Sequence, residues 1–112
     1  VKPLIDIPRM AEKSILMLRE SLNSFVNTDA ELAVEVCKMD DEVDSLETQI
    51  TRELLTYMIS DPRTIDSAIQ LILIARDLER VADLATNIAE DTYYIASGKT
   101  IKHHAMEREM SQ

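Results

Sequence analysis

Apolar residues recur every three or four positions along most of the chain, the spacing that gathers side chains on one face of an α-helix. The first such run predicts a helix from about Ile7 to about Val26, with Pro8 in its first turn, where a missing N–H is tolerated. Its expected core stripe is Met10, Ile15, Leu18, Leu22 and Phe25.

A second helix is predicted from Asp29, a suitable N-cap, to about Ser60. Its apolar positions alternate steps of three and four, as in coiled coils and helical bundles. The expected stripe is Ala33, Val36, Met39, Val43, Leu46, Ile50, Leu54 and Tyr57. Pro62 then ends the pattern, because proline lacks an N–H and moves the preceding residue out of the helical region.

A third helix is expected from about Thr64 to Ser97, and Gly98, the single glycine of the chain, suits a left-handed C-cap. The expected stripe is Ile69, Ile72, Ala75, Leu78, Val81, Ala85, Ile88, Thr92 and Ile95. The stretch from Lys99 to Gln112 shows no strong pattern, and its His103 and His104 are expected to be exposed tail residues.

Three amphipathic helices with short connections predict an all-α fold, an antiparallel up-down-up three-helix bundle formed by one domain over residues 1–112. At about 1.5 Å per residue, the second and third helices would be roughly 45 to 50 Å long and the first nearer 30 Å. The longer pair would leave apolar surface uncovered, which predicts a second bundle or a second copy of the chain as a partner.

Composition narrows the classes of function. With 46% hydrophobic and 29% charged residues, the chain is typical of a soluble helical domain. Its net charge of −9 disfavours nucleic acid and anionic lipid, and favours cations or basic protein surfaces. The longest apolar stretch, residues 68–75, is too short for membrane insertion. The lone Cys37 offers no disulfide or CxxC pair, which suits a reducing compartment, and a small buried side chain is expected there.

The two long helices each carry a row of acidic residues beside the apolar stripe. At about 100° per residue, the row of the second helix spans an arc of about 60° and that of the third about 80°. The rows are Asp40, Asp44, Glu47 and Thr51, and Glu79, Asp83, Asn87 and Glu90. Like charges four residues apart destabilise a helix by about 0.2–0.5 kcal/mol, so a positive group is expected between them.

That positive group is a metal ion or a set of basic side chains. Carboxylate and amide oxygens, without Cys or His in the rows, favour hard cations such as Fe³⁺, Mn²⁺, Mg²⁺ or Ca²⁺ over Zn²⁺. The alternative is a charged surface whose acids pair with Arg76, Arg80, Lys38 and Arg52. The chain has no Glu-x-x-His of the di-iron bundles and no nucleophile with its base, so we expect no enzyme.

Four stretches, RDLERVADLATNIAED, KMDDEVDSLE, DPRTI and SGKTIKH, resemble the PhoU family of phosphate-uptake regulators, over nearly the whole chain. Members are typically tandem repeats of a three-helix bundle. This chain, which begins with Val rather than Met, resembles the second, C-terminal repeat alone. Leu84 stands directly after the second acidic motif, where many members have His or Arg.

The resemblance also implies a site and a role. The E/D-x-x-x-D motifs of the family fall on Asp40 with Asp44 and on Glu79 with Asp83, positions associated with multinuclear iron or other metal clusters. Glu47 and Asn87 continue the two rows. Fe³⁺ is then the first expectation, with Mn²⁺, Mg²⁺, Ca²⁺ or Zn²⁺ after it.

A member of this family is expected to be a cytoplasmic adaptor that connects the ATPase of a phosphate transporter to a sensor histidine kinase and represses phosphate-starvation signalling. Two alternatives stay open: an accessory cytoplasmic domain of a sodium-phosphate cotransporter, and a structural helical module without metal. Direct phosphate sensing is less favoured, because the chain has no phosphate-binding glycine loop and is acidic. We also expect this chain to form a homodimer.

Overall fold

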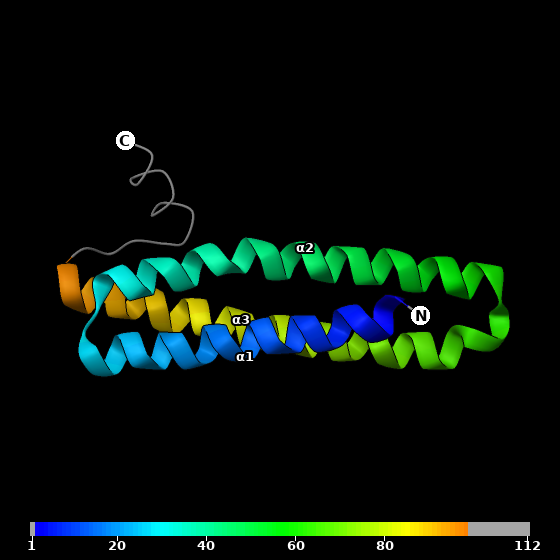
Figure 1. Ribbon diagram of the computed structural model, residues 1–112, viewed down its shortest axis with the longest axis horizontal. Coiled ribbons are helices and arrows are strands. Elements are labelled where there is room, and N and C mark those ends of the chain that lie inside the picture. The colour runs from blue at the N-terminus through cyan, green and yellow to red at the C-terminus, as the bar shows by residue number, and fades with distance from the viewer. Residues whose placement is uncertain (1, 99–112) are drawn as a thin grey trace.

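Three helices packed side by side make up the fold (Figure 1). The computed structural model describes residues 2–98 and, for side chains, residues 5–98. The helices are α1 (Lys2–Asn27), α2 (Ala30–Ser60) and α3 (Ile65–Ser97), and every pair is in contact. The antiparallel up-down-up bundle is 53 Å long, which confirms the predicted fold class. The expectations for residues 99–112, including His103 and His104, lie outside the described residues.

Local hydrogen bonds set the helix ends. Asp29 is the N-cap of α2, and its carboxylate accepts a bond of 3.0 Å from the N–H of Leu32. Gly98 adopts φ 71° at the end of α3 and donates its N–H to the carbonyl of Tyr94 at 2.8 Å. Both caps confirm the sequence-based prediction, since an Asp side chain satisfies a first-turn N–H and glycine enters the left-handed region without strain.

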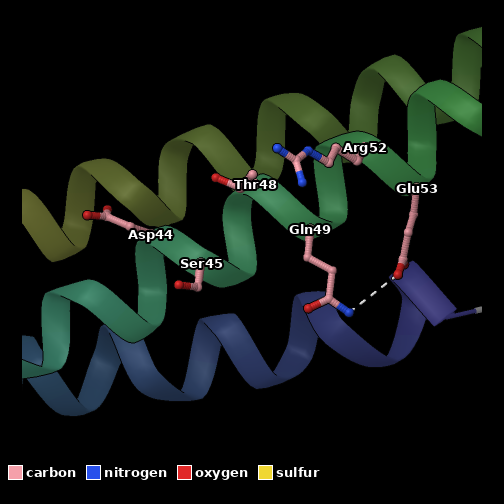
Figure 2. Close-up of a pocket in the computed structure, with 6 residues that line it drawn as sticks. All are labelled: Asp44, Ser45, Thr48, Gln49, Arg52 and Glu53. Atoms are coloured by element: carbon pink, nitrogen blue, oxygen red, sulfur yellow. Dashed lines mark hydrogen bonds between the residues drawn. The ribbon is translucent and has the colours of Figure 1, made fainter.

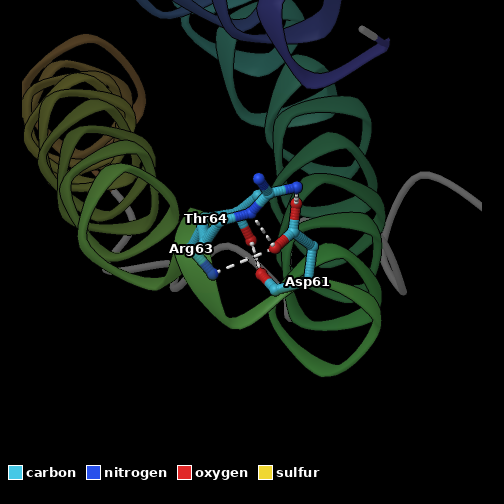
Figure 3. A network of polar contacts seen from close by, with 3 residues as sticks. All are labelled: Asp61, Arg63 and Thr64. Carbon is cyan, nitrogen blue, oxygen red and sulfur yellow. Dashed lines mark hydrogen bonds and ion pairs between the residues drawn. The ribbon is translucent and has the colours of Figure 1, made fainter.

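The turn between α2 and α3 is closed by Asp61 (Figure 3). Its carboxylate accepts bonds of 3.1 Å from the backbone N–H of Arg63 and of 3.0 and 3.1 Å from the Arg63 guanidinium. The Thr64 hydroxyl donates to the Asp61 carbonyl at 2.7 Å. These bonds hold a 3₁₀ turn over Pro62–Thr64 and reverse the chain within a few residues. As a result α2 and α3 run antiparallel.

The first helix differs from its prediction. It begins at Lys2 rather than Ile7, so Pro8 lies inside the helix and not in its first turn. Proline there leaves one carbonyl of the preceding turn without its helical partner, a loss that the packing of Ile7 and Met10 offsets. With 26 residues, α1 is about 39 Å long and covers more of the longer helices than expected.

The core stripe of α1 was also predicted wrongly. The buried positions are Asp6, Ile7, Met10, Ser14, Met17, Ser21 and Ser24. Of the expected residues only Met10 is fully buried, whereas Ile15, Leu22 and Phe25 are exposed. Serine fits the core because it is small, and the hydroxyls of Ser21 and Ser24 donate to carbonyls of their own helix at 2.7 Å.

Alanine dominates the buried face of α3. The buried residues are Ala68, Ala75, Ala82, Ala85, Thr86, Ala89 and Thr92. The expected stripe is right at Ala75, Ala85 and Thr92 but wrong at Ile69 and Ile95, which are exposed. Small side chains on α1 and α3 allow the two backbones to approach closely, so the larger residues beside them are moved to the flanks of the bundle.

The stripe of α2 is largely as predicted, from Ala33 to Leu54. Met39 is half-buried and Tyr57 is exposed, while Cys37 and Asp40 join the buried residues. The expectation of a buried cysteine is confirmed. Within residues 2–98, no helix has the length and apolar character needed to cross a membrane.

Candidate metal centre

The two acidic rows come together where α2 packs against α3. Asp40, Asp44 and Glu79 each offer a carboxylate oxygen, and these three atoms lie within 4.8 Å of one another. Asp40 is buried, Glu79 is half-buried and Asp44 is exposed, so the cluster runs from the core to the surface. Because α2 and α3 are antiparallel, residues far apart in the sequence form one group.

Asp40 occupies a core position that the sequence reasoning did not recognise. It lies four residues after Val36 and three before Val43, both of which are fully buried. The same spacing was visible in the sequence, but a stripe drawn through apolar residues alone passes through Met39 instead. Only 8% of Asp40 is exposed, which places a carboxylate at the inner end of the cluster.

Glu79 shows how strongly the cluster disfavours negative charge. Burial of its carboxyl group, a hydrogen bond with Asp44, and the charges of Asp44, Glu47 and Asp40 raise the pKa of Glu79 from 4.5 to about 9. Two carboxylates can share a hydrogen bond only if one of them is protonated. At neutral pH the metal-free cluster therefore retains a proton.

Glu47 and Asp83 belong to the same electrostatic group. Burial raises the pKa of each, and the charge of Asp44 raises it further. The guanidinium of Arg76 opposes this effect at Glu47 and lowers its pKa in part. Asp44 thus influences all three shifted carboxyl groups. It forms the electrostatic centre of the site.

The site suits a hard cation. The atom Oε2 of Glu79 is buried and has no hydrogen-bond donor among the described residues. A cation supplies positive charge to several carboxylates at once, which the shared proton does only for one pair. The three clustered donors are all carboxylate oxygens, a ligand set that favours Fe³⁺, Mn²⁺, Mg²⁺ or Ca²⁺ over metals that select sulfur.

The alternative interpretation requires the basic side chains to pair with the acids of the rows, but two of them pair with acids elsewhere. Lys38 pairs with Glu35 at 3.6 Å, and Arg80 pairs with Asp77 at 3.1 Å. Neither Glu35 nor Asp77 belongs to a row. Arg76 is close enough to affect Glu47, so it provides part of the compensation.

The remaining members of the rows lie further along the helices. Asn87 is exposed on α3, one turn beyond Asp83, whereas Thr51 and Glu90 are half-buried. The structure brings Asp40 and Asp44 of one row together with Glu79 of the other. Asn87 remains a ligand candidate at the exposed edge of this cluster.

A groove of about 640 Å³ lies on the outer face of α2 and shares only Asp44 with the cluster (Figure 2). In Figure 2 the Asp44 side chain extends toward α3, while Gln49 and Glu53 extend toward α1. The amide of Gln49 donates to Glu53 at 3.4 Å. The groove is thus lined by polar residues of one helix and does not enclose the carboxylate cluster.

The sequence matches the PhoU domain family over residues 7–92, which include every residue of the cluster. The chain belongs to the PhoU family. A protein of Thermotoga maritima named phosphate-specific transport system accessory protein PhoU homolog 2 is 41% identical over 102 residues, 91% of this chain and 43% of that protein. A PhoU homolog of Rhizobium meliloti is 40% identical over 92 residues, 82% of this chain and 39% of that protein.

A third relative, the PhoU homolog of Zymomonas mobilis, is 41% identical over 99 residues, or 88% of this chain and 42% of that protein. The chain therefore spans about two fifths of the length of the curated PhoU relatives that it matches. The resemblance seen in the acidic motifs is confirmed at the level of the family.

Proposed function

We propose that this chain is a PhoU-like regulator of phosphate uptake that binds metal ions through its acidic rows and acts as a protein adaptor. Family membership and the printed names of the relatives support the role in phosphate transport. The observation that carries the metal-binding part is the convergence of Asp40, Asp44 and Glu79 within 4.8 Å.

The proposed cation is held by Asp40, Asp44 and Glu79, with Glu47, Asp83 and Asn87 completing the ligand set. Fe³⁺ is the first candidate, because a small trivalent ion gains most from several carboxylates, and Mn²⁺, Mg²⁺, Ca²⁺ and Zn²⁺ follow. The raised pKa of Glu79 supports this assignment, since a cation would take the place of the proton that the cluster retains.

The adaptor role is not enzymatic. We propose that the chain is the C-terminal repeat of a longer cytoplasmic protein that contacts the ATPase of a phosphate transporter and a sensor histidine kinase. The long exposed flanks of the bundle offer surfaces for such contacts. We also propose that the isolated chain associates with itself, because it leaves large apolar residues exposed.

Elemental mass spectrometry tests the metal site. After exposure to Fe³⁺, Mn²⁺, Mg²⁺, Ca²⁺ or Zn²⁺ and removal of excess ion, the chain should retain metal stoichiometrically, and Asp44→Asn/Glu79→Gln should retain none. Glu31→Gln/Asp66→Asn is the matched control, because it removes two charges from exposed acids outside the rows. Equal metal in all three proteins, or none in any, would contradict the proposed site.

A chimera tests the regulatory role separately. The matched segment of the Rhizobium meliloti relative is replaced by this chain, and a phosphate-starvation reporter is followed in cells that lack their own copy. The reporter should stay repressed in phosphate-rich medium. It should be derepressed when the chimera carries Asp44→Asn/Glu79→Gln but not with Glu31→Gln/Asp66→Asn. A reporter that stays high with the unmodified, stably expressed chimera argues against the role.

A further inference from the structure

The groove along α2 begins at the acidic cluster. Asp44, the exposed member of the cluster, lines its first part, and Thr48 and Arg52 line it further along. These three residues are spaced four apart, so they are neighbours on one side of the helix. Helical side chains lean toward the N-terminus, and in Figure 2 the Arg52 side chain extends toward Thr48. The groove therefore places a hydroxyl and a guanidinium beside the carboxylates.

The guanidinium of Arg52 is available to a ligand. It forms no ion pair with an acid of residues 5–98, whereas Lys38 and Arg80 each pair with an acid outside the rows. Glu53, the other acid of the groove, extends toward α1 and accepts a hydrogen bond from Gln49. The exposed Arg52 thus offers a fork of N–H donors, which suits the paired oxygens of a phosphate.

The acidity of the cluster controls whether an anion can bind beside it. Without a metal ion, Asp44 and its neighbours repel an anion from this end of the groove. A trivalent ion cancels the charge of the three clustered carboxylates, and a bound cation reverses the local electrostatic preference. Arg76 already offsets part of the charge of Glu47. The net charge of −9 therefore argues against phosphate binding only for the metal-free chain.

The proposed cation can itself hold an anion. Hard cations take six or more oxygen ligands, and Mg²⁺ is commonly bound by one or two carboxylates together with a phosphate. The three clustered donors supply only part of such a ligand set. Asp44 is the exposed donor and also lines the groove, so an anion can approach the cation from the side of Thr48 and Arg52.

Hydrogen phosphate has the chemistry that this arrangement requires. Its oxygens can bind the cation, accept the hydroxyl hydrogen of Thr48, and accept two N–H groups of Arg52. Its remaining O–H can donate to a carboxylate of the rows, such as Glu47. Sulfate has no such hydrogen, and neither has the dianion of a phosphomonoester. The row of groups therefore favours free inorganic phosphate over both.

We propose that the metal-loaded chain binds inorganic phosphate at the Asp44 end of the groove, with Thr48 and Arg52 as its ligands from α2. This inference rests on the proposed metal site and adds a second ligand to it. Phosphate binding then depends on the cation, so the chain responds to phosphate directly and only when metal is present.

Equilibrium dialysis with radiolabelled inorganic phosphate tests the proposal at pH 8. The chain is loaded separately with Fe³⁺ and with Mn²⁺ and freed of excess ion, and elemental mass spectrometry measures the metal in the same samples. The loaded chain should bind phosphate at least about tenfold more tightly than the metal-free chain. Unlabelled sulfate and O-phosphoserine should each compete at least about tenfold more weakly than unlabelled phosphate.

A double variant separates the phosphate ligands from the metal ligands. Thr48→Val/Arg52→Gln changes two exposed residues and no acid, so the fold and the metal content should be kept. Its phosphate affinity should fall at least about tenfold, because two charge-assisted contacts are lost. Arg19→Gln/Ser67→Ala is the matched control, since it removes a guanidinium and a hydroxyl from exposed positions outside the groove, and it should bind phosphate normally.

The possible failures are distinguishable. An unmodified chain that retains metal but binds no phosphate would overturn this inference and leave the proposed metal site standing. A chain that retains neither would contradict both. Equal phosphate binding by Thr48→Val/Arg52→Gln would assign the anion to the ion alone, without the groove. Equal competition by sulfate or O-phosphoserine would overturn the preference for inorganic phosphate, and tight binding by the metal-free chain would overturn the dependence on the cation.

Discussion

The two flanks of α3 differ although they share one helix and one core stripe. The flank toward α2 carries Glu79 and Asp83, whose pKa values are raised by burial and by neighbouring acids. The opposite flank carries Leu84 and other large apolar residues that remain half exposed. Between them lies a stripe of fully buried alanines. A narrow core of small residues brings the helices close and leaves both flanks available for binding.

The largest expected loss of stability comes from enlarging a buried alanine in the stripe that separates the two flanks. Ala85→Leu inserts a larger side chain where Ala85 is fully buried, so it should lower the free energy of unfolding by about 1–3 kcal/mol. Urea unfolding followed by circular dichroism measures it. Leu84→Ala, one residue away but 57% exposed, is the control and should cost under about 0.5 kcal/mol in a monomeric background. Equal losses would contradict the assignment of stripe and flank.

The acidic flank should make stability depend on pH. The pKa of Glu79 is about 9 in the folded chain and near 4.5 when unfolded, so the folded state binds more protons between these values. Its contribution to stability is complete below pH 4.5 and is lost as pH rises toward 9. The metal-free chain should therefore be less stable to urea at pH 9 than at pH 5, and Glu79→Gln should reduce the difference. An unchanged pH dependence in that variant would rule Glu79 out as its source.

Removing charge from the acidic flank should cost the metal-free protein little. At pH 10, where Glu79 is ionised, Asp44→Ala/Glu79→Ala relieves like-charge repulsion at two helix positions, so stability should be unchanged or higher by about 0.4–1 kcal/mol. The same double substitution should remove any rise in melting temperature on adding a bound cation, since only the folded site binds it. A destabilisation beyond about 2 kcal/mol would indicate that these acids form a stabilising salt-bridge network.

The smallest change in stability is expected from the exposed ion pair between Asp77 and Arg80 on α3. Asp77→Asn breaks the 3.1 Å pair with Arg80, in which both side chains are about 70% exposed. Exposed pairs of this kind contribute about 0–1 kcal/mol, so the change in stability should be near the limit of a denaturant titration. A loss well above about 1 kcal/mol would contradict the assignment of this pair to the exposed surface.

Most helix ends were predictable from the sequence, because the residues that set them act on the backbone close to them. Asp29, Pro62 and Gly98 act through their own backbone and the next few residues, and each ends or begins a helix where expected. The start of α1 was missed because Pro8 was taken as a mark of the first turn. A proline only raises the cost of a helix there, and packing further along the chain decides whether the helix extends past it.

The candidate site was predictable in its residue types but not in its burial. The spacing of Asp40 with Asp44 and of Glu79 with Asp83 marks two acidic rows in the sequence alone. That Asp40 lies in the core, and that Asp44 influences the pKa of Glu79, Glu47 and Asp83, depends on how α2 is rotated against α3. Rotation is a property of the packed pair and not of either helix.

By itself, the sequence determined that three amphipathic helices form, where the two connections between them lie, and that two of the helices carry acidic rows. These features follow from local backbone preferences and from the helical repeat. Only the tertiary structure decided which of two neighbouring stripes becomes the core. In α1 both Ser14 with Ser21 and Ile15 with Leu22 have the right spacing, and the serines are buried. Close packing against the alanines of α3 selects the smaller side chains, because bulky residues there would hold the backbones apart.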